Sequence, residues 1–177
     1  MTTIEGEAFF RCASSLGRTF CFMGEYVVDI YRIAFIGHRE ILGCSLIENE
    51  VERVARDMLR NKEYVEFYMG RNGDFDILSA SAIKRVQKAV GNHNSRLILL
   101  QPYRMKDDEY YEKYYDEVQY PVDSKTHPKA AITKRNRWMV EVSDMLIAFV
   151  EDERKGGAYT TLNYAQKLEK TIINLAE

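Results

Sequence analysis

The chain has few of the residues that build disulfide frameworks or metal centres. Its 177 residues include only three cysteines and three histidines. Cys12, Cys21 and Cys44 show no CxxC spacing, and their odd number argues against a disulfide framework, so we expect a reducing, cytoplasmic environment. The histidines lie far apart and no HExxH motif occurs, so we expect neither a metal site nor a cofactor.

Long apolar runs and an excess of one charge are absent too. No apolar stretch approaches the ~20 residues of a membrane-spanning helix, and the run at 20–23 is too short for a signal-peptide core. The formal net charge is −2 at pH 7, which gives no overall attraction toward nucleic acid or anionic membranes. We therefore expect neither a membrane nor nucleic acid as a partner.

The chain does contain a regular alternation of strand-like and helix-like segments. Apolar, branched and aromatic runs predict strands at 31–36, 64–69, 96–100, 117–120, 145–150 and 171–175. Helix-length segments separate these runs, which indicates a parallel sheet with right-handed crossovers. We predict one Rossmann-like α/β domain over residues 30–177, a mostly parallel sheet flanked by helices in three layers. Residues 1–29 form an N-terminal extension outside this pattern.

Glycine-containing turns follow three of the predicted strands. Gly37, Gly70 and Gly156 each come directly or closely after a strand end. Ligands of open parallel sheets bind beyond the carboxyl ends of the strands, so these turns are expected to converge on one pocket. The backbone N–H groups of Gly156 and Gly157, with the Thr160 hydroxyl at the predicted helix start, suit a bound anion.

Polar side chains accompany the first two turns. His38 and Arg39 follow Gly37, and an arginine offers a planar fork to a phosphate or carboxylate. After Gly70 and a second glycine, Gly73, the chain carries two aspartates, at positions 74 and 76. We expect one of them to cap the following helix and the other to accept a ribose hydroxyl, and position alone does not choose between them.

A basic segment on a later helix completes the candidate set. Arg135 shares a helical face with Met139 and Val142, and a charge on an apolar face needs a partner or a ligand. The alternative is a solvated basic patch whose long side chains reach water. The candidate ligand- or phosphate-binding residues are Gly37, His38, Arg39, Gly70, Gly73, Asp76, Arg135, Asn136, Gly156, Gly157 and Thr160.

In order and spacing, these segments resemble the SLOG superfamily, the Rossmann-like group of the Smf, DprA and LOG proteins, and within it the YpsA-like bacterial proteins. The similarity lies at 35–39, at 70–76, at 135–140 leading into 143–148, and at Gly156-Gly157 with Thr160. It covers about residues 31–175. The resemblance implies a Rossmann-like sheet with a pocket for a nucleotide or a nucleotide-derived ligand.

The LOG-type phosphoribohydrolases are the enzymatic branch of the superfamily that the chain resembles. These cleave the N-glycosidic bond of a nucleoside monophosphate with a PGGxGTxxE turn and an upstream arginine. Arg135 matches the arginine, but Lys155 and Tyr159 replace the proline and the third glycine. Leu162 and Asn163 stand where acidic residues are expected, and Asn163 cannot supply the carboxylate that such a reaction needs.

We therefore expect a cytoplasmic binding or sensor protein for a nucleotide-derived small molecule. An N-glycosidic hydrolase that uses Glu141 and Asp76 as its catalytic carboxylates is the alternative, so whether the chain is an enzyme stays open. A third hypothesis is an oligomeric interaction protein. Tyrosines at 110–115 and the aromatic N-terminal extension would form its interface, and on this ground we expect a homo-oligomer.

Overall fold

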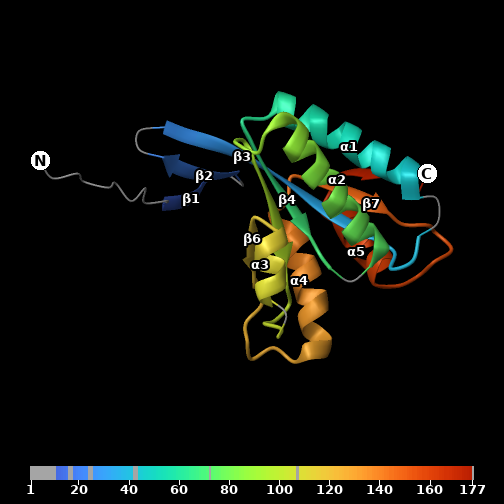
Figure 1. Ribbon diagram of the computed structural model, residues 1–177. Coiled ribbons are helices and arrows are strands. Elements are labelled where there is room, and N and C mark those ends of the chain that lie inside the picture. Colours follow the sequence, from blue (N-terminus) through green and yellow to red (C-terminus); the bar gives the residue numbers. More distant parts are fainter. Residues whose placement is uncertain are drawn as a thin grey trace, which may run out of the picture.

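The computed structural model describes residues 11–15, 18–23, 26–41, 44–71, 73–106 and 108–176 (Figure 1). Strands and helices alternate along most of this length. In chain order the elements are β1 (Arg11–Ser15), β2 (Arg18–Met23), β3 (Tyr26–Gly37), α1 (Cys44–Asn61), β4 (Tyr64–Met69), α2 (Asp74–Val90), β5 (Ser95–Leu100), α3 (Asp108–Tyr114), β6 (Glu117–Gln119), α4 (Pro128–Val142), β7 (Met145–Phe149), α5 (Gly157–Lys167) and β8 (Thr171–Asn174).

Six of the strands form a parallel sheet in the spatial order β6-β5-β4-β3-β7-β8. The chain starts in the middle at β3 and adds β4, β5 and β6 on one side. It then crosses back through α4 to place β7 on the other side of β3. This reversal makes the carboxyl ends of β3 and β7 a topological switch point, where ligands of open α/β sheets bind. The predicted Rossmann-like α/β fold is confirmed.

The first two strands extend this sheet at its amino end. β1 pairs antiparallel with β2, and β2 pairs antiparallel with the first residues of β3, in the register Phe20↔Asp29 to Met23↔Tyr26. β3 therefore crosses the predicted boundary between residues 29 and 30. Its first part belongs to an antiparallel ribbon and its second part to the parallel sheet.

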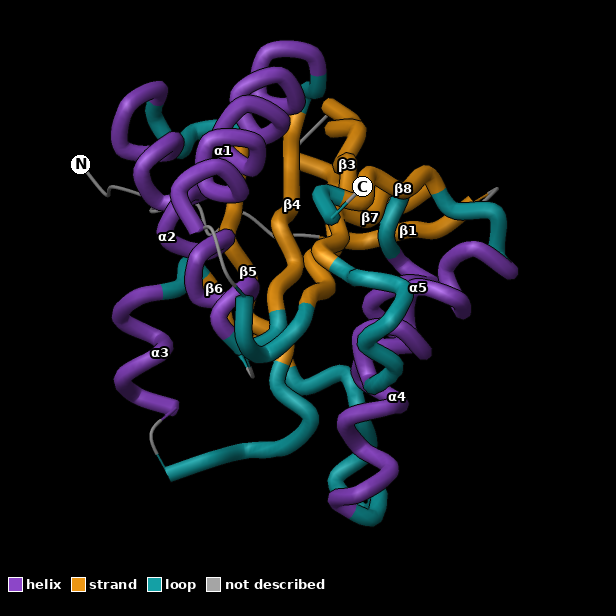
Figure 2. The backbone as a smooth tube through the Cα atoms, turned by 90° about the vertical axis from the view of Figure 1, so that its right-hand side faces the viewer, coloured by secondary structure: helices purple, strands orange, loops and turns teal. Residues whose placement is uncertain are grey.

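The sheet is the middle of three layers. Figure 2 shows α1 and α2 on one side of the strands and α4 and α5 on the other. Successive residues of β3 point to opposite faces, so Ile33 and Phe35 join the core under α1 and α2, whereas Ala34 and Ile36 join the core under α4 and α5. Burying each large side chain stabilises the fold by roughly 1.5–3 kcal/mol, and this two-sided burial explains why the strands read as continuous apolar runs.

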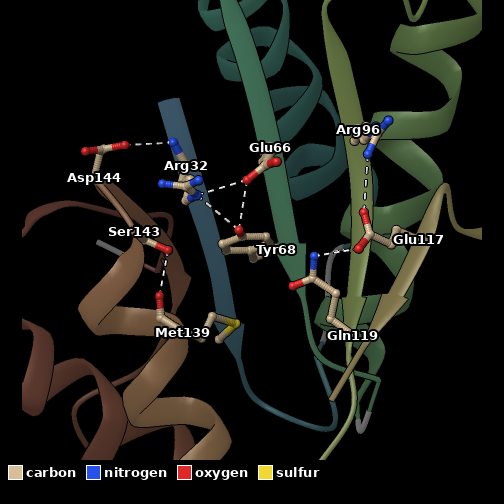
Figure 3. A network of polar contacts seen from close by, with 9 residues as sticks. All are labelled: Arg32, Glu66, Tyr68, Arg96, Glu117, Gln119, Met139, Ser143 and Asp144. Carbon is tan, nitrogen blue, oxygen red and sulfur yellow. Dashed lines mark hydrogen bonds and ion pairs between the residues drawn. The ribbon is translucent and has the colours of Figure 1, made fainter. Parts of the chain in front are cut away.

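A polar network on the α4 side ties β3, β4 and the start of β7 together (Figure 3). The Arg32 Nε atom lies 2.9 Å from a Glu66 carboxylate oxygen, and the Tyr68 hydroxyl donates to the same oxygen at 2.8 Å. The Arg32 backbone N–H donates to Asp144 at 2.8 Å. Burial, together with the Glu66 carboxylate, holds the pKa of Tyr68 well above its usual value. The hydroxyl therefore stays protonated and keeps its role as donor.

The last helix is displaced from its predicted position. The sequence pattern predicts a helix from residue 160 to 170, whereas α5 runs from Gly157 to Lys167 with Gly156 as its N-cap. It ends early because Glu169 adopts a left-handed backbone (φ 52°), which a helix does not continue. The earlier start brings the first turn of α5 up to the switch point.

Candidate functional site

A cavity of about 310 Å³ opens at the switch point. Its wall combines the end of β3 and the turn after it, one residue of α2, the middle of α4 and the start of α5. The lining residues are Phe35, Ile36, Gly37, His38, Arg39, Asp76, Ile132, Arg135, Asn136, Gly156, Gly157 and Ala158. Segments more than 100 residues apart in the sequence thus meet at the carboxyl edge of the sheet.

The structure brings most of the candidate residues together and leaves two aside. The lining contains Gly37, His38, Arg39, Asp76, Arg135, Asn136, Gly156 and Gly157. Gly70 and Gly73 lie directly behind this lining. Thr160 lines a different cavity, and its hydroxyl donates to the Gly156 carbonyl at 2.9 Å. Glu141 lines neither cavity, and its carboxylate accepts a hydrogen bond from the Tyr164 hydroxyl at 2.6 Å.

Arg135 is the most distinctive side chain of the cavity. It is only 4% exposed, and its Nε atom is buried without a hydrogen-bond partner among the described residues. Burial lowers the pKa of its guanidinium, and the charge of Asp76 opposes that shift. A buried cation whose charge is disfavoured by its surroundings is a site where an anionic ligand would be stabilising.

Gly70 makes room for that arginine. A Cβ atom at residue 70 would lie 2.5 Å from the Arg135 Nη1 atom and 2.9 Å from an Asp76 carboxylate oxygen. The end of β4 therefore lets the guanidinium and the carboxylate approach its backbone. The side chain of Asn136 is anchored nearby, because its Nδ2 donates to the Thr161 hydroxyl at 3.3 Å, while its Oδ1 is buried without a partner in the described part of the chain.

His38 joins the two sides of the cavity. Its backbone N–H donates to Phe149 at 3.2 Å, and its Nε2 accepts the Glu151 backbone N–H at 2.9 Å. The ring is therefore the neutral tautomer with its proton on Nδ1. Burial and the nearby Arg154 lower the pKa of His38, against a smaller opposing effect of Glu151. The turn after β3 and the loop after β7 are thus held together by an uncharged imidazole.

The prediction that an aspartate caps α2 is wrong. The N-cap is Gly73, which makes no side-chain cap, and the first helical N–H, of Asp74, donates to the Arg39 carbonyl at 2.7 Å. The Asp74 carboxylate instead accepts the Ile41 backbone N–H at 3.3 Å. Asp76, also in the first turn of α2, lines the cavity.

Sequence reasoning missed the apolar part of the lining. Phe35, Ile36, Ile132 and Ala158 were not candidates, yet each contributes to the wall. One signal was present: Ile132 lies three residues before Arg135, which places both on one side of α4. Of the cavity's ionisable groups, only Asp76 is a carboxylate, and the part of the chain described here holds no cluster of three His, Cys, Asp or Glu residues fit for a metal.

The fold and this cavity define the class: a Rossmann-like α/β domain with its cavity at the switch point. No protein-family model and no curated protein sequence matches the chain. Among solved structures, the chain is similar to DNA processing protein A of Helicobacter pylori, which has a single-stranded DNA binding mode. The TM-score is 0.55 at 19% identity, over 80% of this chain and 63% of the other, so under two thirds of that protein is matched. A weaker similarity, to the Moco carrier protein of Chlamydomonas rheinhardtii, has a TM-score of 0.48 at 12% identity and covers 82% and 76% of the two chains.

The first of these similarities corrects one expectation. Nucleic acid was set aside as a partner because the net charge is −2, but the same fold occurs in a protein that binds single-stranded DNA. Net charge sums over the whole surface, whereas single strands are bound by local grooves with cations and aromatic rings. The charge balance therefore does not exclude nucleic acid. The described residues include no helix that is long and apolar enough to cross a bilayer.

Proposed function

We propose that the chain binds a nucleotide or a nucleotide-derived ligand in the switch-point cavity. The observation that carries this proposal is Arg135, a buried cation that lines the cavity and lacks a partner for its Nε atom among the described residues. A phosphate group is the natural counterpart, because an arginine bonds phosphate through a planar pair of donors. Arg39, exposed at the rim, adds a second positive charge.

The start of α5 supports the same ligand. Gly156 is the N-cap of α5 and Gly157 its first residue, and apart from the adjoining backbone no described atom lies within 4 Å of a Cβ atom built on either of them. A helix start presents backbone N–H groups and the positive end of the helix dipole, which favour a phosphate. The Asp76 carboxylate, which lies near the Arg135 guanidinium, is suited to accept a ribose hydroxyl.

We further propose membership of the SLOG superfamily, closest to its YpsA-like group, on the order of the motifs and the Rossmann-like fold. Binding is favoured over N-glycosidic hydrolysis. Leu162, at one expected acidic position, is buried in the core under α4 and α5, and Asn163 lines a different cavity. Glu141 is held by Tyr164 outside the cavity, so a hydrolytic mechanism would depend on Asp76. Release of free base from nucleoside monophosphates that persists in Asp76→Asn would exclude that mechanism.

Calorimetry and thermal unfolding with nucleoside monophosphates, ADP-ribose and cyclic nucleotides test the binding proposal. A ligand at 100 times its dissociation constant should add about 2.7 kcal/mol to the free energy of unfolding. Arg135→Gln should weaken binding by about tenfold or more, and Arg53→Gln, on an exposed face of α1, should not. No stabilisation by any of these compounds, in a protein shown to be folded, would contradict the proposal.

A second candidate ligand is single-stranded nucleic acid. The observation that favours it is the similarity, at a TM-score of 0.55, to a protein that binds single-stranded DNA. The same cavity would then take one nucleotide of a strand instead of a free nucleotide. Competition tests this shared site: a free nucleotide that displaces an oligonucleotide one for one occupies the same cavity. The two candidates are then distinguished by their relative affinities.

A further inference from the structure

A second hollow lies beside the proposed nucleotide cavity, between α4 and α5. Its volume is about 270 Å³. All of its lining side chains are polar or aromatic, and they include two cations, Arg137 and Lys167, and no carboxylate. This composition differs from the chain as a whole, which carries slightly more acidic than basic residues. We call this hollow the α4–α5 groove.

The groove and the cavity share a wall. Asn136, which lines the cavity, donates to the hydroxyl of Thr161, which lines the groove, at 3.3 Å. Thr160 and Thr161 in turn donate to the carbonyl groups of Gly156 and Gly157, at 2.9 Å and 2.7 Å. The same first turn of α5 therefore faces the cavity with its glycines and the groove with its threonines.

The two cations of the groove are available to a ligand. Arg137 lies over the Tyr164 ring at 5.4 Å, and within the described residues neither Arg137 nor Lys167 forms an ion pair with a carboxylate. Several surface cations elsewhere in the described part of the chain do pair with a carboxylate, for example Arg53 with Glu50 at 2.8 Å. A nearby carboxylate, of Glu141, accepts the Tyr164 hydroxyl at 2.6 Å and does not line the groove. Two cations that form no ion pair, in a hollow lined by no carboxylate, favour a negatively charged group.

We propose that the α4–α5 groove is a second phosphate subsite, so that the ligand carries at least two phosphate-linked units. This inference rests on the proposed function, in which the cavity takes the first unit. The ligand would run over the first turn of α5, with one phosphate at the glycine pair and the next between Arg137 and Lys167. A small dinucleotide and a single-stranded nucleic acid share this chemistry.

The experiment compares deoxyadenosine monophosphate, the 5′-phosphorylated dinucleotide of deoxyadenosine, and a longer single-stranded oligodeoxyadenylate at several salt concentrations. The dinucleotide should bind about tenfold or more tightly than the mononucleotide. The double variant Arg137→Gln, Lys167→Gln should lose this increment and leave mononucleotide affinity unchanged. For the oligonucleotide, each lost phosphate contact should lower the slope of log affinity against log salt by about 0.7.

The controls distinguish the proposed groove subsite from the proposed nucleotide binding in the cavity, on which it rests. Lys88→Gln, on α2 across the sheet, should change neither affinity nor salt slope. Two outcomes overturn the groove alone, provided that mononucleotide binding depends on Arg135. One is a dinucleotide that binds no more tightly than the mononucleotide, and the other is a gain in affinity that survives the double variant. Absence of binding by all three probes overturns both proposals. An increment complete at two units identifies a small dinucleotide, and one that grows with length identifies a strand.

Discussion

The glycines around the cavity fall into two groups that differ in what surrounds them. Gly37, Gly70 and Gly73, at the ends of β3 and β4, have no space for a side chain: an added Cβ atom would lie 2.3 Å from the Phe75 ring, 2.5 Å from Arg135 and 2.6 Å from the Arg39 backbone, respectively. Gly156 and Gly157, after β7, have nothing within 4 Å. The first group is required by packing inside the chain.

The second group has no such requirement. Gly156 has an extended backbone (φ −175°), which any residue can adopt, and a positive φ among the described glycines occurs only at Gly91. Neither conformation nor contact within the chain demands glycine at this turn. A glycine without an internal reason, in the wall of a cavity, is consistent with close approach of something outside the chain. Gly37, Gly70 and Gly73 thus serve packing within the chain, whereas Gly156 and Gly157 form the wall proposed to contact phosphate.

The largest effect is expected from Gly37→Ala. The new methyl group would overlap the fully buried Phe75 ring, which has no room to retreat, so the free energy of unfolding should fall by roughly 3 kcal/mol. Gly157→Ala, in the first turn of α5, should leave it unchanged or raise it by up to about 1 kcal/mol. Denaturant unfolding of both variants measures the contrast, and equal stabilities would abolish the distinction between the two walls.

The next effect concerns affinity. Gly156→Asp provides a favourable N-cap, so stability should be retained, but its negative charge at the helix start should repel a phosphate. We expect nucleotide affinity to fall by about 30-fold, close to 2 kcal/mol. Gly156→Asn, which has nearly the same shape without the charge, is the matched control and should lose less. If both variants bind as tightly as the natural sequence, the glycine pair is not the phosphate wall.

Gly70→Ala should have an intermediate effect on stability. Its Cβ atom meets the ends of the Arg135 and Asp76 side chains, which can move, so about 1 kcal/mol is expected and not the larger cost at Gly37. Unfolding measurements on Gly70→Ala, Arg135→Met and the double variant give the coupling between the two sites. The double variant should be more stable than the sum of the single losses. Strict additivity would show that Gly70 and Arg135 do not contact.

Much of the fold was predictable because apolar runs and helical spacing agree with it. The runs at 64–69, 96–100 and 145–150 coincide with β4, β5 and β7 to within one residue at each end, since strands buried on both faces have an unambiguous composition. The strands before residue 26 were not predicted, because the apolar run at 20–23 in β2 is shorter than the runs of the parallel sheet and β1 has no comparable run. The left-handed residue at Glu169, which ends α5, has no sequence signal of the usual kind, since glycine or asparagine is normally found there.

The candidate site was predictable only in part. Its glycines and Arg135 could be found because strand ends of a parallel sheet converge and because a charge on an apolar helix face is unusual. Glu141 is six residues beyond Arg135, which is about 9 Å along the helix axis and away from the carboxyl edge of the sheet. Spacing along α4 could have excluded it. The position of Thr160 depended on where α5 begins, which sequence patterns locate poorly.

The smallest predicted effect concerns the hydrogen bond from the Glu151 N–H to His38, which joins the turn after β3 to the loop after β7. His38 accepts the Glu151 N–H in its neutral form, and its pKa is lowered in the folded protein by burial and by Arg154. Below the ordinary histidine pKa of about 6.5, the unfolded chain then binds a proton that the folded chain does not, so stability should fall as the pH falls. The slope for this one proton is at most about 1.4 kcal/mol per pH unit, between about pH 6.5 and the lowered pKa. In His38→Gln, the amide oxygen can still accept the N–H but does not titrate. Unfolding curves across this range should therefore be flatter for the variant, and identical pH profiles would mean that the joint does not depend on a neutral imidazole.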